Sequence, residues 1–280
     1  MKIGFIGAGK VGCTLAKYFT IKGYTVAGFF SRNYDDSLQA SQFTNSEAYL
    51  TLSRLVDACD CLFITVPDSQ IALVWQELAQ LSIKNKFIGH CSGLLTSALF
   101  KQADSHYSLG FSLHPLSAIY DRFNCYQTLN DVHFTLEASS TVNHQLLPFF
   151  KKLGNPIATL SPNHKALYHA ACVVLSNHVV ALAHMGSVLL MQCGLDNHFC
   201  NSAWHQLFIG NANNLCQSNP IQALTGPIER GDLATIQQHL AVLPTEYQSI
   251  YKQLSQILIT ISRQKHPEKD YKQLELELLL

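Results

Sequence analysis

Gly7, Gly9 and Gly12 have a spacing that suits the binding of a phosphate group. An apolar run over residues 3–6 leads into them, and the residues after them have the apolar spacing of a helix. In a strand–turn–helix unit, the first glycine permits a tight turn, the second lets a pyrophosphate approach the backbone, and the third allows close packing. The helix N-terminus presents free N–H groups to the anion. We assign the following residues to this dinucleotide site, the alternative being a turn without a ligand: Gly7, Ala8, Gly9, Lys10, Val11 and Gly12.

The end of the second expected strand, residues 24–30, indicates which dinucleotide is preferred. NAD-binding folds usually carry an acidic residue about twenty residues after the glycines, where it binds the ribose hydroxyl groups. This chain has Ser31 and Arg32 at that place. A guanidinium pairs with a 2′-phosphate, and a serine hydroxyl donates a hydrogen bond to it. The pattern favours NADP over NAD; the alternative is an exposed arginine, with Asp35 or Asp36 binding the ribose.

Three further short polar segments each follow an apolar run that we interpret as a strand. If these strands are parallel, their carboxyl ends lie at one edge of the sheet, where open α/β sheets bind ligands. The alternative is that the segments are ordinary polar surface loops. We assign the first two segments to the cofactor, namely Val66, Pro67, Asp68, His90 and Ser92. Ser92 and His114, which precedes Pro115, are assigned to the substrate.

Acid–base candidates lie in the second half of the chain, where the pattern predicts a helix from about residue 162 to 193. Lys165 and His169 are four residues apart and therefore share a helical face with Tyr168. Transfer of a hydride to a carbonyl or imine carbon leaves a heteroatom that needs a proton, which a lysine or histidine can donate. Asn177 is a candidate to orient the substrate. The alternative is a polar stripe on a half-exposed helix.

A rigid loop is expected over residues 225–232, because two glycines and a proline occur there together. We assign four of its members to substrate binding, namely Thr225, Gly226, Pro227 and Arg230. An arginine can hold a carboxylate through two parallel hydrogen bonds. The alternative interpretation is that Arg230 simply pairs with its neighbours Glu229 or Asp232.

Strand and helix patterns alternate up to about residue 160, and only helix patterns follow with confidence. Such alternation predicts a parallel sheet with helices on both faces. We expect an α/β fold with a doubly wound Rossmann sheet over residues 1–160, then an all-α domain for substrate binding and dimerisation over residues 161–280. Residues 170–194 are apolar enough to suggest a membrane span, but their serine, asparagine and histidine side chains suit a bilayer poorly. A helix buried within a domain or a dimer is the preferred interpretation.

The composition argues against several function classes. The formal net charge is zero, with 19 basic and 19 acidic residues, so neither nucleic acid nor a membrane surface is an expected partner. The nine cysteines form no CxxC pair and the 13 histidines show no metal-ligand spacing, so we expect reduced thiols and no bound metal. Because Met1 leads directly into a strand, no signal peptide is expected. These features favour a cytoplasmic protein that acts on a small molecule.

Taken together, the motifs resemble a family of Rossmann-like proteins whose C-terminal half is a domain of unknown function, DUF2520. The resemblance covers essentially the whole chain. It rests on the glycine turn, Ser31-Arg32, the 66–68 and 90–93 segments, His114-Pro115, Lys165, the 167–171 segment, Ser176-Asn177 and the 223–232 stretch. More distantly, the chain is similar to pyrroline-5-carboxylate reductase, ketopantoate reductase and the β-hydroxyacid dehydrogenases.

This resemblance implies an NADP-dependent oxidoreductase that forms a homodimer through its helical domain. In several of the distant relatives, a lysine and an asparagine on the interdomain helix serve the reacting group. Lys165 and Asn177 match them loosely in position, but their spacing departs from the β-hydroxyacid pattern. The expected reaction transfers a hydride between nicotinamide and a small carboxylate-bearing carbonyl or imine compound. The alternative is a sensor or scaffold that binds NADP(H) without turnover.

Overall fold

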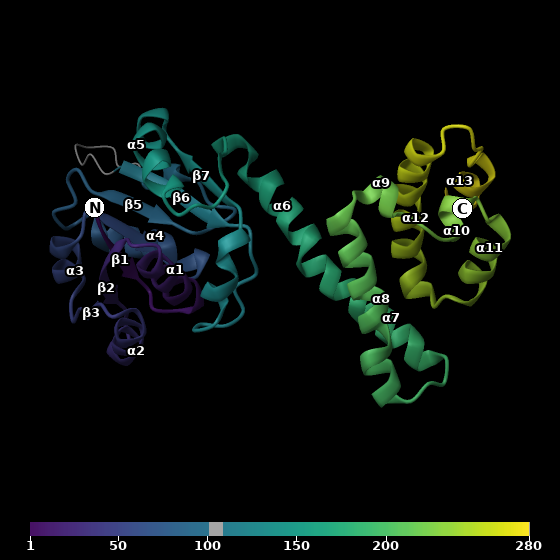
Figure 1. Cartoon of the computed structure of the whole chain (residues 1–280), viewed down its shortest axis with the longest axis horizontal. Helices are drawn as coiled ribbons and strands as arrows, with labels where there is room; N and C mark the ends of the chain where they lie inside the picture. The colour runs from purple at the N-terminus through teal and green to yellow at the C-terminus, as the bar shows by residue number, and fades with distance from the viewer. Residues whose placement is uncertain (101–108, 280) are drawn as a thin grey trace. The chain divides into compact units, whose positions relative to one another are not determined.

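The computed structural model in Figure 1 describes residues 1–100 and 109–279, and the chain forms two compact units, Met1–Ser176 and Asn177–Leu280. The described part of the first unit contains an eight-stranded sheet with the order β3-β2-β1-β4-β5-β6-β7-β8. Its strands are β1 (Lys2–Ile6), β2 (Thr25–Phe30), β3 (Glu47–Ala48), β4 (Cys61–Ile64), β5 (Phe87–His90), β6 (Leu109–Pro115), β7 (Phe134–Ala138) and β8 (Ile157–Thr159).

Helices cover both faces of this sheet. They are α1 (Lys10–Ile21), α2 (Tyr34–Thr44), α3 (Leu52–Ala58), α4 (Asp68–Leu78) and α5 (Ser140–Lys151). Successive side chains of a strand point to opposite faces, so the β4 neighbours Phe63 and Ile64 enter different cores. Phe63 packs with Phe19 of α1, whereas Ile64 belongs to the core that contains Trp75 of α4. The expected α/β fold with a doubly wound sheet is therefore confirmed.

The strands that carry the predicted ligand-binding residues are parallel to one another. The order reverses at β1, which pairs in parallel with both β2 and β4, and β5 and β6 extend the parallel set. Their carboxyl ends consequently share one edge. β7 is antiparallel to β6, and the chain between them forms a short 3₁₀ segment, η2 (Cys125–Asp131), rather than an α-helix.

The first unit continues past residue 160 into η3 (Pro162–His164) and α6 (Lys165–Leu175). α6 is held to the sheet because Lys165 bonds to Ser112 of β6 and Tyr168 bonds to Thr135 of β7. The single helix expected over residues 162–193 is divided at Ser176, whose backbone angles of φ −124° and ψ −74° interrupt the helix.

The second unit contains helices and, among its described residues, no strand, which confirms the expected all-α half. The helices are α7 (Asn177–Gln192), α8 (Asn197–Gln217), α9 (Pro220–Ala223), α10 (Pro227–Arg230), α11 (Leu233–Val242), α12 (Thr245–Lys265) and α13 (Lys272–Leu279). Its core is small and apolar and consists of Ile228, Ile236, Ile259, Tyr271, Leu274 and Leu278.

α7 and α8 pack against each other but take little part in that core. No residue of α7 is buried within the chain, and Cys200 is the buried residue of α8. Of the two settings expected for this helix, a domain or a dimer, burial within its own domain is not seen for α7. Among the described residues, the stretch Pro162–Gln192 is long and apolar enough to cross a membrane, by its length and composition only.

Candidate functional site

The glycine turn between β1 and α1 has the geometry of a phosphate site. Gly7 has a φ of +100°, in the region that favours glycine. A Cβ atom at Gly12 would lie 2.4 Å from the Gly7 carbonyl oxygen, whereas a Cβ atom at Gly9 would meet nothing within 4 Å. No side chain caps the N-terminus of α1, so its first N–H groups remain available to an anion. The turn therefore fits a pyrophosphate.

A cavity of about 530 Å³ opens at this turn, a size typical of small-molecule sites. Many of the residues predicted to bind the cofactor line it, namely Gly7, Ala8, Gly9, Lys10, Ser31, Arg32, Val66 and Pro67. Val11 and Gly12 lie within α1 and are not part of the lining. Asp68, His90 and Ser92 belong instead to a separate polar cluster.

Two arginines line the cavity, and their surroundings differ. Arg32 has no hydrogen-bond or ion-pair partner among the described residues. Arg122 donates through Nη2 to the Asp36 carbonyl oxygen at 2.8 Å and through Nε to Cys13 Sγ at 3.2 Å. The Asp36 carboxylate also lines the cavity and lies 3.5 Å from Arg122 Nη1. The sequence did not point to Arg122, because 86 residues separate it from Asp36.

The polar cluster begins just after β5. Ser92 Oγ donates to Asp68 Oδ2 at 2.6 Å and accepts from the N–H groups of Leu94 and Leu95 at 3.1 and 2.9 Å. Asp68 lies in the first turn of α4. These bonds fix the 92–95 turn to the carboxyl end of β4, which is the edge that also carries the glycine turn.

Lys165 lies beneath this turn. Its side chain is 1% exposed, and Nζ donates to the Ser92 carbonyl oxygen at 2.7 Å and to Ser112 Oγ at 2.6 Å. Burial lowers the pKa of Lys165 to about 8, against the opposing effect of the Glu137 carboxylate. The structure thus encloses Lys165 between the turn after β5 and strand β6.

His90 and His114 differ in what their rings contact. His90 Nδ1 accepts from the Ser92 N–H at 3.2 Å, and Nε2 lies 3.4 Å from the Thr96 carbonyl oxygen, so both nitrogens have protein partners. His114 Nδ1 lies 2.6 Å from the Tyr168 hydroxyl oxygen, whereas its Nε2 has no partner among the described residues. Burial is the main cause that lowers the pKa of both rings to about 4, which leaves them neutral near pH 7.

Two imidazole rings converge on Gly93. A Cβ atom at this position would lie 2.7 Å from His169 Cδ2 and 3.0 Å from His114 Nε2. The structure therefore brings the predicted residues His114 and His169 together beside the 92–93 backbone, with Lys165 behind it. Tyr168 joins them through its bond to His114.

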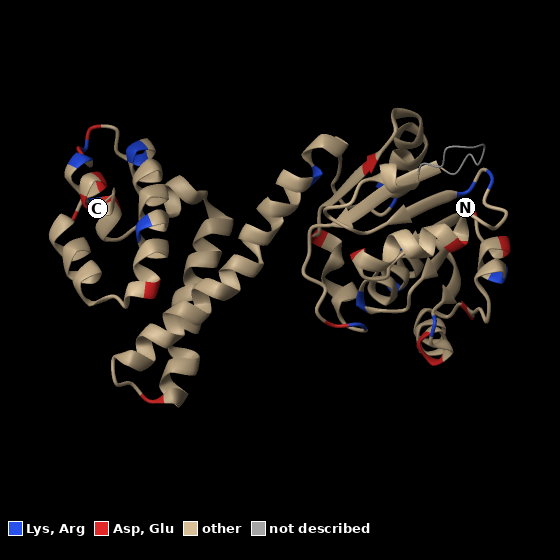
Figure 2. Ribbon diagram, turned by 180° about the vertical axis from the view of Figure 1, so that it is seen from behind, with Lys and Arg blue, Asp and Glu red and all other residues tan. Residues whose placement is uncertain are grey.

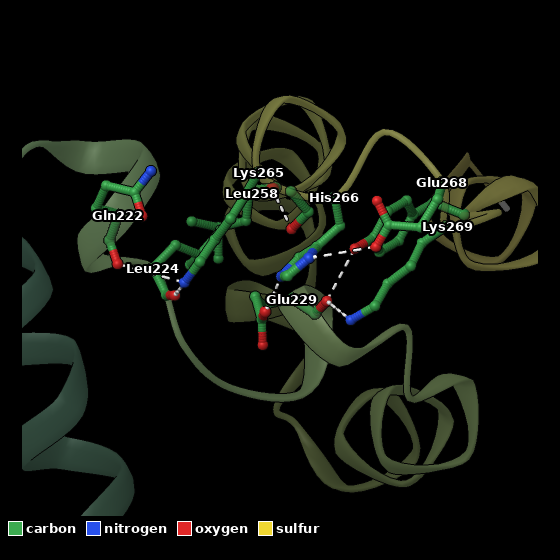
Figure 3. Close-up of polar contacts among 10 residues, drawn as sticks. Gln222, Leu224, Glu229, Leu258, Lys265, His266, Glu268 and Lys269 are labelled. Atoms are coloured by element: carbon green, nitrogen blue, oxygen red, sulfur yellow. Dashed lines mark hydrogen bonds and ion pairs between the residues drawn. The ribbon is translucent and has the colours of Figure 1, made fainter.

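The remaining predicted residues, Asn177 and the 225–230 loop, belong to the second unit. Figure 3 shows how this loop is braced: the His266 ring contacts the Glu229 carboxylate, and Lys265 Nζ donates to the Leu224 carbonyl oxygen at 2.7 Å. Thr225 and Pro227 also line an apolar cavity of about 370 Å³.

Arg230 lies between two acidic residues that are otherwise engaged. Glu229 contacts His266, and Asp232 accepts from the Thr235 N–H at 3.1 Å and hydroxyl at 2.7 Å. Neither carboxylate forms an ion pair with Arg230 in the described part of the chain. The simple pairing weighed for Arg230 is therefore not seen. Residues 1–100 and 109–279 contain no cluster of three His, Cys, Asp or Glu side chains that could hold a metal ion.

Two protein-family models match successive parts of the chain, and the second match spans the boundary between the two units. A Rossmann-like domain matches residues 1–115, and the domain of unknown function DUF2520 matches residues 132–257. The resemblance drawn from the motifs is thereby confirmed. No curated protein matches the chain.

Solved structures resemble the chain over almost its full length. A Thermotoga maritima protein (TM1727) is 24% identical, with a TM-score of 0.72, and the match covers 94% of this chain and 99% of that one. A candidate NADP oxidoreductase from Bacteroides fragilis is 20% identical, with a TM-score of 0.66 and coverages of 95% and 98%. The pyrroline carboxylate reductase of Plasmodium falciparum, solved with NADP bound, is 14% identical, with a TM-score of 0.60 and coverages of 95% and 96%. At these identities, the matches show a shared fold.

Proposed function

Because the chain belongs to the proteins that join a Rossmann-like domain to a DUF2520 domain, we propose that it is an NADP-dependent oxidoreductase. The observation that carries this proposal is the glycine turn, where no side chain caps the helix and the adjoining cavity extends to Arg32. The turn lies at the same edge of the sheet as the polar cluster around Ser92. Structural neighbours named as NADP-linked reductases support it. The proposed substrate is a small carboxylate-bearing carbonyl or imine compound.

The residues of the first unit would hold the cofactor at two points. The amide groups of the glycine turn bind the pyrophosphate, and Ser31 and Arg32 bind the 2′-phosphate. Arg122 assists indirectly, because it engages the Asp36 carboxylate that would otherwise repel this phosphate. When bound, NADPH supplies a hydride to the substrate carbon.

The polar cluster supplies the proton that this reduction requires. As the carbon accepts the hydride, the π electrons of the double bond move to its oxygen or nitrogen, which then takes a proton from Lys165 or His169. His169 is the better placed of the two, because Lys165 is enclosed and already donates to Ser92 and Ser112. Substrate binding by Asn177 and by Arg230 with its loop, which belong to the second unit, stays a prediction.

The test is NADPH oxidation by the full chain against a panel of 2-oxo acids, cyclic imines and aldehydes. Turnover with at least one class is the expected result. Tight NADPH binding without oxidation across the whole panel would support the alternative, a non-catalytic sensor or scaffold, and would remove the enzymatic proposal.

We also propose that a second copy of the chain covers α7 and α8. Between Lys165 and Glu229, the only Asp, Glu, Lys or Arg is Asp196, and Figure 2 shows both helices free of charged residues. Large apolar side chains on them are open to solvent, among them Val180 at 69% and Leu207 at 72%. Exposed apolar surface of this extent is typical of an interface.

Val180→Glu is expected to convert a dimer into a monomer in sedimentation equilibrium, because a buried unpaired carboxylate is costly at an interface. Val242→Glu is the matched control, since Val242 of α11 is 80% exposed and lies outside these helices. A wild-type protein that is monomeric, or one that floats with phospholipid vesicles, would contradict the dimer proposal.

A cytoplasmic location completes the proposal. All nine cysteines are unpaired, including Cys193 and Cys216 at exposed positions, which is typical of a reducing compartment.

A further inference from the structure

We propose that Tyr168 and Thr135 position His114 as a hydrogen-bond donor to the carbonyl or imine heteroatom of the substrate. This role rests on the oxidoreductase function proposed for the same site. His114 acts on the substrate directly, whereas Tyr168 and Thr135 act through its ring.

A chain of hydrogen bonds sets the direction of the donors. Thr135 Oγ1 donates to the Tyr168 hydroxyl oxygen at 3.1 Å, and that hydroxyl lies 2.6 Å from His114 Nδ1. Burial raises the pKa of Tyr168, so the phenol keeps its proton. His114 Nδ1 lies 2.6 Å from the phenol oxygen, and we infer that it accepts the phenol proton while Thr135 donates to the same oxygen.

The remaining proton of the His114 ring is then fixed. Burial lowers the pKa of His114, and the nearby Lys165 and His169 lower it further, while Asp68 acts in the opposite direction. A neutral imidazole carries one N–H group, and Nδ1 is occupied as an acceptor. His114 must therefore carry its proton on Nε2.

This Nε2–H group belongs to a ring that is only half-buried, and it is the group that we propose meets the substrate. It has no protein partner among the described residues, and it lies beside Gly93 opposite the His169 ring. Glycine at position 93 lets both rings approach the backbone closely, since a Cβ atom there would collide with both of them. A neutral imidazole stabilises the negative charge that develops on a substrate oxygen and keeps its own proton. The proton that is transferred comes from His169 or Lys165.

The tautomer of His114 can be measured without any substrate. In ¹⁵N NMR spectra of histidine-labelled wild-type protein, we expect a pyridine-type Nδ1 and a pyrrole-type Nε2 for His114. Tyr168→Phe removes the phenol donor and is expected to populate the Nδ1–H tautomer as well. Tyr24→Phe is the control, because the Tyr24 hydroxyl donates its hydrogen bond to the Phe149 carbonyl oxygen in the same unit and not to His114. The proposal would be overturned if His114 of the wild-type protein carried its proton on Nδ1, or if the His114 tautomer were unchanged in Tyr168→Phe.

Kinetics separate this role from the general function. With the panel substrate that is turned over, His114→Leu is expected to lower kcat about 10²–10³-fold, as for the loss of one preorganised donor. His114→Gln, which retains an N–H donor, is expected to recover part of that loss. A kcat in His114→Leu that matches wild type would overturn the donor role. Absence of NADPH binding in every variant and in wild type would instead refute the oxidoreductase function, and the NMR spectra would still decide the tautomer.

Discussion

Replacing His169 with alanine is expected to lower kcat by about 10²–10⁴-fold, the range for loss of a general acid. The ring lies beside Gly93 and opposite His114, where the substrate heteroatom would need its proton. Steady-state NADPH oxidation measures kcat, and a fluorescence titration is expected to show NADPH binding unchanged. His144→Ala is the control, since His144 lies exposed on α5.

Lys165→Met extends this test to the other acid candidate. Loss of the ammonium group removes the donor to the Ser112 hydroxyl and one of the two donors to the Ser92 carbonyl, which keeps its bond from Ser112 Oγ. We therefore expect a lower melting temperature together with a lower kcat. If His169→Ala and Lys165→Met both turn over the substrate as wild type does, acid catalysis by this cluster is refuted.

Gly9→Ala is expected to weaken NADPH binding by about 100-fold, or about 2.7 kcal/mol, without lowering the melting temperature. The new Cβ atom meets no protein atom within 4 Å, and φ at Gly9 is −79°, which alanine adopts readily. It would, however, occupy the space where the pyrophosphate approaches the backbone. Isothermal titration calorimetry and a thermal melt of the same sample provide the two readouts.

Gly12→Ala provides the contrast. Its Cβ atom would lie 2.4 Å from the Gly7 carbonyl oxygen, so the turn itself must shift and the melting temperature is expected to fall as well. Unchanged NADPH affinity in Gly9→Ala would mean that the dinucleotide does not lie over this turn.

The sequence specified the parts of the fold that depend on local patterns. The glycine turn, the buried strand β4 and the amphipathic helices of the first unit each follow from residues close together in the chain. The break at Ser176 could not be predicted, because the apolar spacing continues through it and no proline marks it. The antiparallel β7 was also missed, since its direction depends on how the preceding segment folds rather than on β7 itself.

The candidate site was only partly predictable for a similar reason. The sequence identified His114 at the end of a strand and Lys165 and His169 on one face of a helix, but not which of them contact one another. The bond between Tyr168 and His114 joins residues 54 positions apart, and Lys165 reaches Ser92 across 73 positions. Such contacts depend on the sheet order, which brings β5, β6 and the start of α6 together.

The measurement that tests the central claim most directly is the binding of NADPH and NADH to the full chain by calorimetry. The account predicts that NADPH binds at least about 10-fold more tightly than NADH, because hydrogen bonds to a charged group contribute about 1.5–3 kcal/mol. Arg32→Gln is expected to abolish that difference by weakening NADPH binding alone. Binding of neither nucleotide at millimolar concentration would contradict the account.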